Sequence, residues 1–364
     1  MRLHHDQRGL VDDVKTREIV MSEITSVTTE QQTPQAQLAQ MAIAHWYSSL
    51  VYVAAETSLA DRLAEAPRTA AELAQSMGYD APSLYRFMRT LAGLGLFTED
   101  VGHRFSLAPL GEVLRADTPG SVRSSVLTLA GPLFTKPANE LHYSIKTGKT
   151  SFERVFGLPL FEWLAKHPVE ASMFSETMVG LHGAEPGAVA KAYDFSQFET
   201  VVDVGGATGN LLAAILNHHR QPRGILFDLP HVVHDAPALI KARGLTDRVA
   251  IQSGNFFESV PAADGGYLLS HIIHDWSEAQ CLTILGNCRR VMTPKSRLLI
   301  IEMVLPTGNT PHLGKMFDMV MLTVPGGRER TEPEYCELLE KAGFRFTQVV
   351  PTASAVGIVE ALPA

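Results

Sequence analysis

The chain is poor in the residues and segments that mark several protein classes. Only three of its 364 residues are cysteine, and Cys281, Cys288 and Cys336 have no metal-ligand spacing. We therefore expect neither a disulfide framework nor a cysteine metal site, and we expect a reducing, cytoplasmic location. No apolar run approaches the length of a membrane-spanning helix. The first twenty residues carry acids and lack the apolar core of a secretory signal.

Positive charge is also scarce. The chain has 31 lysines and arginines against 39 aspartates and glutamates, which gives a net charge of −8, and it has no long basic block. A nucleic-acid backbone or an anionic membrane surface needs a clustered positive face. We therefore expect no nucleic-acid partner and no membrane partner.

What is present is a composition typical of globular domains, with 45% hydrophobic residues. The length of 364 residues exceeds the usual size of one domain, so at least two are expected. Residues 1–33 are polar, include the low-complexity run TSVTTEQQT and are expected to form a disordered extension.

The pattern from residue 34 to 120 predicts a winged helix. Apolar residues at helical spacing cover 36–63, Thr69 and Glu72 fit a capping box, and residues 97–107 fit a short hairpin. Winged helices often bind DNA, but Arg86 and Arg89 are the only strong cations of the second helix. A packing or dimerisation role is therefore favoured over DNA readout.

Residues 121–185 are predicted to be mostly helical, and strands alternate with helices from residue 200 onward. This alternation indicates an α/β fold with a doubly wound, mostly parallel sheet. The last two strand patterns, 344–350 and 355–361, are joined by so short a turn that they must pair antiparallel. The other predicted strands are 201–204, 224–227, 249–251, 266–270 and 297–303, and the predicted helices are 210–219, 231–243, 277–292 and 332–342.

The most informative segment is VVDVGGATGNLL, residues 201–212. A β-branched run ends in an acid, a glycine-rich turn follows, and a helical pattern then begins. Ligands bind at such turns because glycines let them approach the backbone closely. Ala207 replaces the second glycine of a dinucleotide fingerprint, so the turn instead resembles the S-adenosylmethionine turn of class I methyltransferases. Asp228, at the end of the next strand, is suited to accept hydrogen bonds from ribose hydroxyls.

A histidine and two acids are candidates for acid–base chemistry. In LLSHIIHDWSEAQC, His274 follows the strand at 266–270 and lies at the same sheet edge as the glycine turn. Histidine is a natural base for a phenol or a similar hydroxyl, and a nearby carboxylate stabilises the imidazolium that forms. Glu302 and Glu329 are the candidate carboxylates, although each is equally suited to a surface position or to pairing with Arg328 or Arg330.

Taken together, six motifs resemble the small-molecule O-methyltransferases that act on caffeate, flavonoids or acetylserotonin, with their bacterial antibiotic-tailoring relatives. These motifs are VVDVGGATGN, FDLPHVV, GNFFESVP, HIIHDWSEAQC, IIEMVLP and GGRERTEPEY. The resemblance covers residue 35 to the C-terminus. It implies a winged-helix dimerisation domain at 34–120, a helical linker and substrate-pocket segment at 121–185, and an S-adenosylmethionine-binding domain at 186–364.

The resemblance also implies a role for individual residues. His274 would be the general base, steered by Glu302 and Glu329, with no metal. The expected partners are a small aromatic hydroxyl substrate and a second copy of the chain, and the cofactor would leave as S-adenosylhomocysteine. The cofactor would contact Asp203, Gly205, Gly206, Gly209, Asp228, Leu229, Asn255, Phe256 and Ser270, and the acceptor pocket would include Phe161, Phe174, Met178, Met321 and Leu322.

Two departures from the family pattern bear on the prediction. Asn255 stands where the family usually has aspartate, which weakens the adenine contact, and Ser270 replaces a basic residue common in plant members. Some relatives use the cofactor without methylating and usually lack the base. The presence of His274 favours methyl transfer over that alternative, and over a winged-helix DNA-binding regulator.

Overall fold

The computed structural model describes residues 33–364, so almost all of the extension predicted at 1–33 lies outside the described residues. The chain divides into two compact units, residues 1–51 and 52–364. The described part of the first unit holds α2 (Pro34–Ile43), capped by the Thr33 hydroxyl, and the start of α3 (His45–Glu56). No helix of residues 33–364 is long and apolar enough to cross a membrane.

The second unit begins with the predicted winged-helix layout. After α3 come α4 (Leu59–Ala64), β1 (Arg68–Thr69), α5 (Ala70–Met77), α6 (Ala81–Gly93), β2 (Phe97–Glu99), β3 (Arg104–Leu107) and α7 (Pro109–Glu112). The Thr69–Glu72 capping box is confirmed, and the three strands form one antiparallel sheet in the order β1-β3-β2. The helical pattern over 36–63 forms three helices, and α3 ends before α4 where Ser58 adopts a left-handed conformation with φ of 53°.

A run of short helices follows, as the sequence predicted for residues 121–185. Prolines and glycines set their ends, because proline begins a helix readily and glycine accepts the left-handed cap. The helices are α8 (Arg123–Leu129), α9 (Pro132–Asn139), α10 (Leu141–Thr147), α11 (Ser151–Phe156), α12 (Leu160–Leu164), α13 (Pro168–His182) and α14 (Glu185–Ala192).

The rest of the second unit is built on the predicted doubly wound sheet. Its seven strands lie in the order β11-β12-β8-β7-β4-β5-β6, and β4 to β8 are all parallel. The antiparallel C-terminal pair is confirmed as well. The bounds are β4 (Thr200–Val204), β5 (Arg223–Asp228), β6 (Val249–Ser253), β7 (Gly265–Ser270), β8 (Arg297–Glu302), β11 (Phe344–Pro351) and β12 (Gly357–Pro363).

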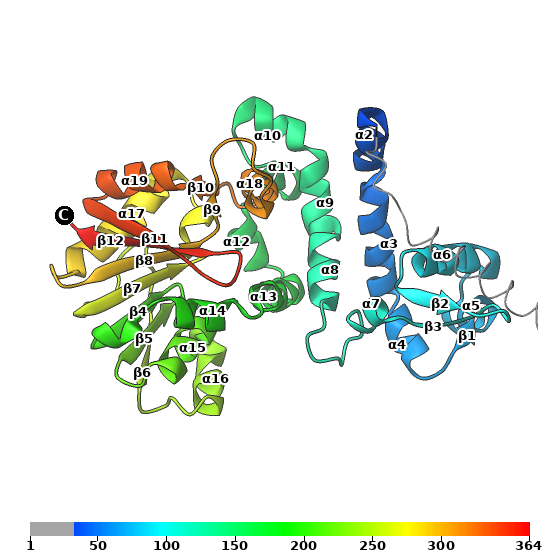
Figure 1. The fold of residues 1–364 in the computed structure, drawn as a ribbon, viewed down its shortest axis with the longest axis horizontal. Helices are drawn as coiled ribbons and strands as arrows, with labels where there is room; N and C mark the ends of the chain where they lie inside the picture. Colours follow the sequence, from blue (N-terminus) through cyan, green and yellow to red (C-terminus); the bar gives the residue numbers. More distant parts are fainter. Residues whose placement is uncertain (1–32) are drawn as a thin grey trace, which may run out of the picture. The chain divides into compact units, whose positions relative to one another are not determined.

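Helices cover both faces of this sheet (Figure 1). On one face α14, α15 (Asn210–His218) and α16 (Ala236–Ala242) bury apolar residues against it, and on the other face α17 (Glu278–Val291) and α19 (Glu332–Lys341) do so. The predicted helix 231–243 is shorter and begins with a 3-10 turn at Val233–Asp235, because Pro237 fits the first turn of α16. Sequence analysis missed the parallel pair β9 (Val304–Leu305) and β10 (Arg330–Thr331), and it missed α18 (Leu313–Thr323).

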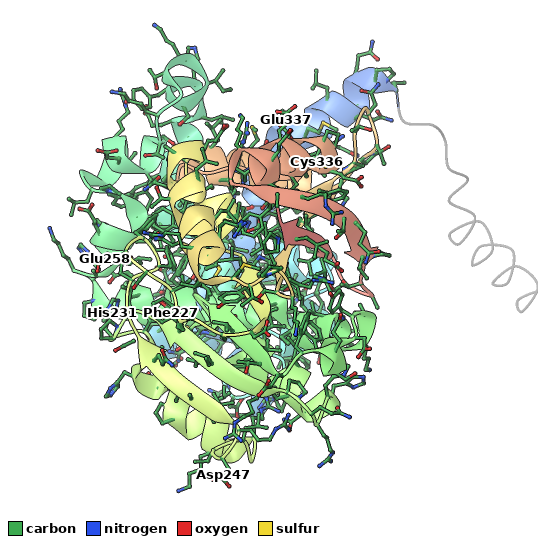
Figure 2. The ribbon with its side chains drawn as sticks, turned by 90° about the vertical axis from the view of Figure 1, so that its left-hand side faces the viewer. Phe227, His231, Asp247, Glu258, Cys336 and Glu337 are labelled. Carbon is green, nitrogen blue, oxygen red and sulfur yellow. The ribbon has the colours of Figure 1, made fainter. Side chains whose placement is uncertain are left out.

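The strand order creates one switch point. From β4 the chain winds outward to β5 and β6, then returns to place β7 on the other side of β4. The carboxyl ends of the parallel strands share one edge. In Figure 2, Phe227, His231 and Glu258 mark that edge beside β5 and β6, and Asp247, which precedes β6, marks the opposite edge. Ligands of open α/β sheets bind outside the carboxyl ends at such a switch point.

Candidate active site

The glycine turn after β4 is shaped by its own backbone, and its first two glycines leave no room for side chains. Gly205 and Gly209 have φ values of 75° and 87°, and Ala207 adopts the same left-handed region at 49°. A Cβ on Gly206 would lie 2.5 Å from the carboxyl carbon of Asp203, and one on Gly205 would lie 2.4 Å from Ile272 Cδ1. The turn therefore requires glycine at these positions, because its main chain packs directly on the side chains around it.

Asp203 lies beneath this turn and not on its surface. Its side chain is 1% exposed, and neither carboxylate oxygen has a hydrogen-bond partner. Burial, together with the nearby charge of Asp228, raises the pKa of Asp203 to about 7. Asp203 therefore supports the turn from inside the protein, and its contact with the cofactor stays a prediction.

Asp228 ends β5 and faces the same turn. Its Oδ2 accepts a hydrogen bond from the N–H of Ala207 at 2.9 Å, and its Oδ1 accepts one from the N–H of Leu229 at 2.7 Å. A carboxylate has about four acceptor positions, so each oxygen can accept a further bond from a ribose hydroxyl. Burial raises the pKa of Asp228 in spite of both bonds.

His274 lies in a 3-10 turn (Ile273–Asp275) just past β7. Its Nδ1 is 2.9 Å from Glu329 Oε1, and its Nε2 is 3.7 Å from Asp275 Oδ1. The hydrogen bond to Glu329 brings together two residues that are 55 positions apart in sequence. In the neutral imidazole this contact places the proton on Nδ1 and leaves the lone pair on Nε2.

Glu302 reaches His274 in a different way from the one predicted. It ends β8, is completely buried, and accepts a hydrogen bond at Oε1 from the backbone N–H of His274 at 3.1 Å. Its Oε2 accepts a hydrogen bond from the hydroxyl of Tyr335 on α19. Glu302 thus holds the loop that carries His274, whereas Glu329 holds the ring itself.

Three carboxylates surround the imidazole. Burial alone lowers a histidine pKa, but here Asp275, Glu329 and Glu302 outweigh it and raise the pKa of His274 to about 10. Burial raises the pKa of Asp275 to about 6. The site is therefore built to stabilise an imidazolium, the species that a general base becomes when it accepts a proton.

Two residues to which the sequence assigned no such role anchor the Glu329 segment. The backbone N–H of Glu329 donates to Asp318 Oδ1 on α18 at 2.9 Å. The guanidinium Nη1 of Arg330, fully buried, donates at 3.2 Å to the carbonyls of Ile273 and Arg328, the residues just before His274 and Glu329. From the sequence, Arg330 was considered only as an ion-pair partner of the two glutamates, and Asp318 was only an acid on an apolar helix.

The remaining predicted cofactor residues lie along the same sheet edge. Asn255 Oδ1 accepts the N–H of Phe257 at 3.0 Å, so its side chain shapes the loop after β6. The ring of Phe256 packs edge-on to Trp276 with centroids 6.1 Å apart. Ser270 ends β7, and Leu229 is exposed directly after Asp228.

The predicted acceptor-pocket residues are only partly gathered near His274. Phe161 on α12 is 38% exposed and stacks on Trp276, two residues beyond His274, with centroids 5.3 Å apart. Phe174 on α13 packs instead into a core with Phe152 and Leu160. Met321 is buried on α18, while Met178 on α13 and Leu322 on α18 are partly buried.

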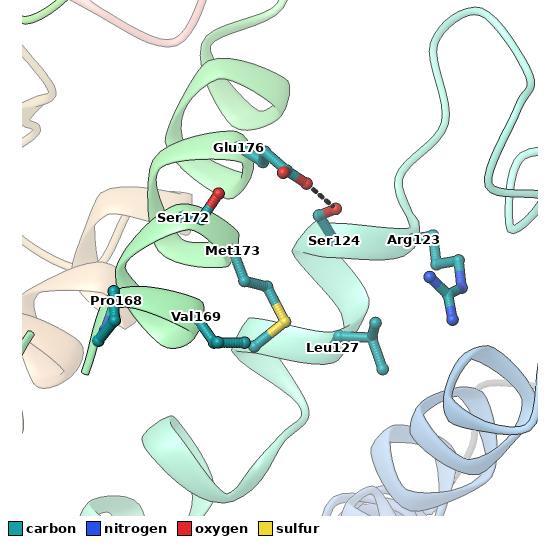
Figure 3. A pocket seen from close by; sticks show the side chains of 8 residues that line it. All are labelled: Arg123, Ser124, Leu127, Pro168, Val169, Ser172, Met173 and Glu176. Atoms are coloured by element: carbon teal, nitrogen blue, oxygen red, sulfur yellow. Dashed lines mark hydrogen bonds between the residues drawn. The ribbon is translucent and has the colours of Figure 1, made fainter. Parts of the chain in front are cut away.

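A separate open groove of about 530 Å³ lies between α8 and α13 (Figure 3). Met173 and Leu127 line it, and the hydroxyl of Ser124 donates to Glu176 Oε2 at 2.8 Å across it. It contains none of the predicted site residues, so it is not the acceptor pocket expected from the sequence.

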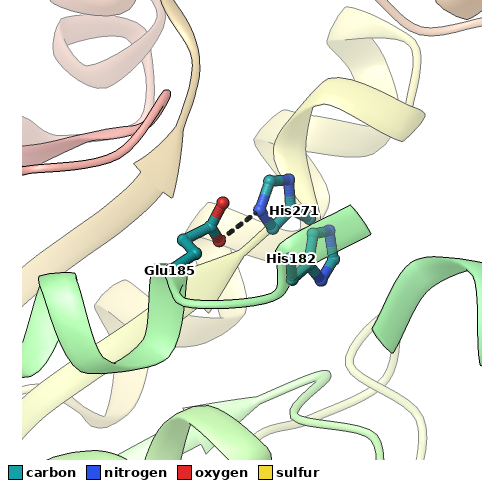
Figure 4. Close-up of side chains that lie close together, drawn as sticks. All are labelled: His182, Glu185 and His271. Atoms are coloured by element: carbon teal, nitrogen blue, oxygen red, sulfur yellow. Dashed lines mark hydrogen bonds and ion pairs between the residues drawn. The ribbon is translucent and has the colours of Figure 1, made fainter. Parts of the chain in front are cut away.

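A second cluster adjoins His274 and was not expected. His271, the first residue after β7, stacks on His182 at the end of α13 with ring centroids 4.0 Å apart, and its Nε2 lies 2.7 Å from Glu185 Oε1 (Figure 4). The rings of His271 and His274 are 5.3 Å apart. Burial, followed by the charge of His271, lowers the pKa of His182 to about 4.

Comparison with known proteins places this geometry in a family. Residues 139–345 match the O-methyltransferase domain, and residues 39–117 match the O-methyltransferase dimerisation domain. The chain belongs to the O-methyltransferase family. It is therefore an enzyme, and the resemblance seen in its sequence is confirmed.

Two curated relatives and two solved structures cover most of the chain. A phenazine O-methyltransferase of Lysobacter antibioticus is 42% identical over 90% of this chain and 95% of its own. An O-demethylpuromycin O-methyltransferase of Streptomyces alboniger is 38% identical over 87% of this chain and 86% of its own. The crystal structure of LaPhzM has a TM-score of 0.84 and 42% sequence identity, and the match covers 91% of this chain and 99% of that one. A neocarzinostatin-biosynthesis O-methyltransferase has a TM-score of 0.78 and 34% sequence identity, and the match covers 87% of this chain and 96% of that one. It was solved with S-adenosylmethionine and 2-hydroxy-5-methyl naphthoic acid.

The cofactor prediction is confirmed in the same way. Structural relatives are solved with S-adenosylmethionine or S-adenosylhomocysteine bound. This O-methyltransferase uses S-adenosylmethionine. The free acceptor positions of Asp228 and the glycine-rich turn beside it fit that group, because it needs close backbone approach and a ribose acceptor.

Proposed function

We propose that this O-methyltransferase methylates a hydroxyl group of an aromatic small molecule, with His274 as general base. The observation that carries the proposal is the hydrogen bond between His274 Nδ1 and Glu329, 2.9 Å long, at the switch point of the sheet. It leaves Nε2 as the nitrogen that accepts a proton, beside the turn that suits the cofactor. The phenazine, puromycin and naphthoate relatives act on aromatic compounds by name, which supports an aromatic acceptor.

The chain's residues contribute alignment and proton transfer. The cofactor supplies a methyl group on a sulfonium, and the acceptor oxygen attacks that methyl in line. His274 Nε2 takes the hydroxyl proton as the oxygen–carbon bond forms and the carbon–sulfur bond breaks, and neutral S-adenosylhomocysteine leaves. Glu329, Glu302 and Asp275 stabilise the imidazolium, and the exposed ring of Phe161, stacked on Trp276, offers an apolar surface to an aromatic acceptor.

The cofactor would be held by the elements at the switch point. We assign the backbone of Gly205, Gly206 and Gly209 to the methionine part and Asp228 to the ribose, with Leu229 alongside. Asn255 and Phe256 flank the adenine, Ser270 lies toward the methionine, and Asp203 supports the turn from below. The proposed acceptor wall consists of Phe161, Phe174, Met178, Met321 and Leu322.

We also propose that the enzyme is a homodimer formed through residues 39–117, which match the dimerisation domain. An obligate interface of this kind buries more than about 2,000 Å². Light scattering should give twice the chain mass of 39.7 kDa at micromolar concentration. A monomer under these conditions would contradict the assembly but not the chemistry.

A single-turnover assay tests the chemistry. The chain is mixed with S-adenosylmethionine and a panel of phenols, naphthols and hydroxyphenazines, and methylated product is measured by mass spectrometry. With a confirmed acceptor that is neutral at the assay pH, His274→Ala should slow transfer by about 10²–10⁴-fold and leave cofactor affinity nearly unchanged. An acceptor that is already ionised should lose less, since no proton remains to be removed. Near-wild-type transfer to the neutral acceptor would refute His274 as the base.

A further inference from the structure

Three side chains with metal-ligand chemistry converge beside the proposed active site (Figure 4). His182 ends α13, Glu185 begins α14 and His271 follows β7. One nitrogen from each imidazole and one carboxylate oxygen all lie within 4.8 Å of one another. Among the described residues, this is the only such group of three. None of the three has a part in the proposed proton transfer.

The pair His271 and Glu185 already has nearly the spacing of two ligands on one ion. Its Nε2 and Oε1 are 2.7 Å apart, and the two side chains are only 14% and 12% exposed. Zinc binds imidazole nitrogen and carboxylate oxygen at about 2.0–2.2 Å, so tetrahedral ligands lie roughly 3.3 Å apart. An ion that replaces the shared proton needs these two atoms to separate by only about 0.6 Å.

His182 can complete the set by leaving its stack. Neither of its ring nitrogens has a hydrogen bond among residues 33–364, and its ring stacks on His271 with an interplanar angle of 11°. A metal ion lies in the plane of the imidazole that binds it, so His182 must turn toward Glu185. The residue is the last of α13, so this turn does not interrupt the helix.

The backbone at His271 is a second, independent sign of a functional position. Its φ is 53°, in the left-handed region that non-glycine residues rarely adopt, and its N–H is held by the carbonyl of Ile301 at 3.1 Å. Such strain persists where the surrounding structure requires it and is concentrated at functional sites. Here the result is that the imidazole meets Glu185 and His182.

We propose that His182, Glu185 and His271 form a binding site for one divalent transition-metal ion, with zinc as the physiological occupant. Two imidazole nitrogens and one carboxylate oxygen make a set that suits zinc, cobalt or nickel, whereas magnesium and calcium require mostly oxygen ligands. Three protein ligands leave one coordination position open to water or to a small ligand.

The test is a titration of the full-length chain, freed of metal by a chelator, with cobalt alone. Visible absorption reports the coordination of cobalt, and calorimetry with zinc gives affinity and stoichiometry. We expect one ion per chain and no competition from magnesium. His182→Phe keeps an aromatic ring for the stack, Glu185→Gln keeps the side-chain shape, and His271→Asn introduces a residue that tolerates positive φ. Each should weaken binding by at least about tenfold, by analogy with the effect of losing a supporting group.

His218→Asn is the matched control, because His218 also adjoins a second histidine, with centroids 4.8 Å apart, far from the cluster in sequence. It should leave the affinity unchanged. Thermal melting without metal checks that each variant folds, and if His271→Asn fails that check the other two decide the question. Affinity unchanged in the folded variants would overturn the site.

Discussion

The hydroxyl of Tyr335 donates a hydrogen bond to Glu302 Oε2, while Glu302 Oε1 accepts the backbone N–H of His274. Both side chains are completely buried. A residue of the last helix therefore reaches the proposed base through one carboxylate. Burial and the charge of Glu302 raise the pKa of Tyr335 well above its ordinary value, so the phenol remains a donor at any working pH.

Tyr335→Phe should lower the single-turnover rate without changing the affinity for the acceptor, because Glu302 loses the donor that orients it. In the Glu302→Gln background the same change should have little further effect, since the carboxylate through which it acts is gone. Tyr267→Phe is the control, because Tyr267 is equally buried but its hydroxyl binds only the backbone of Pro261 and Ala263. Rate losses that simply add in the double variant would assign Tyr335 a structural role only.

The rate should rise with pH into the alkaline range. Asp275, Glu329 and Glu302 raise the pKa of His274 to about 10 against the opposing effect of burial. The neutral imidazole that accepts a proton therefore becomes more abundant until about that pH, where the single-turnover rate should level off. A rate independent of pH between 7 and 9, with an acceptor that stays neutral there, would contradict this expectation.

Glu329→Gln should move the rising limb of that profile to lower pH. Removal of one negative charge next to Nδ1 makes the imidazolium less favourable, so the pKa of His274 falls. The plateau rate should drop as well, because the imidazolium formed during transfer is less stable. Glu360→Gln, at another buried glutamate that pairs with Gln348, is the control and should leave the profile in place.

Asp228→Ala should weaken S-adenosylmethionine binding, because the ribose hydroxyls lose a charged acceptor and each such bond contributes roughly 1.5–3 kcal/mol. Calorimetry of cofactor binding measures the effect. Asp247→Ala, at the opposite edge of the sheet, is the matched control (Figure 2). Equal affinities in wild type and the Asp228 variant would remove this residue from the cofactor site.

Asp203→Asn should change how stability depends on pH. The pKa of Asp203 is raised to about 7 in the folded chain by burial and by Asp228, against an ordinary value of 3.8. The folded state thus holds a proton that the unfolded chain releases, and this contribution is fully present below pH 3.8 and is lost as pH rises to about 7. The variant lacks that loss of stability. The denaturation midpoint of the variant should therefore rise relative to that of the wild type as the pH increases from 5 to 8. A constant difference across this interval would contradict the raised pKa.

Much of the architecture could be predicted from local patterns in the sequence. Alternating strands and helices, the short turn before the last strand and the capping box at Thr69 each depend on neighbours in sequence, and all are confirmed. Element ends were less accurate where a single backbone angle decides them. The left-handed Ser58 divides a continuous apolar pattern, which carries no sign of that angle.

The site was predictable only in part. His274 and Glu329 were named from the sequence, and the fold brings them into hydrogen bonding. Glu302 was named too, but its contact with the backbone of His274 was not foreseen. Tyr335 went unnoticed and Arg330 was considered only as an ion-pair partner, because a buried tyrosine or arginine has no local signature until its partner is known.

The sequence by itself determined the order of elements and the glycine turn, and it named the proposed base and its acids, because each is a property of a short segment. Only the tertiary structure decided which acid holds the ring of His274, which holds its backbone, and that His182 and Glu185 meet His271. Those contacts join residues 28 to 86 positions apart or come from separate helices. They exist because the chain returns across β4 and places the carboxyl ends of β7 and β8 beside the start of α14 and the loop before β10.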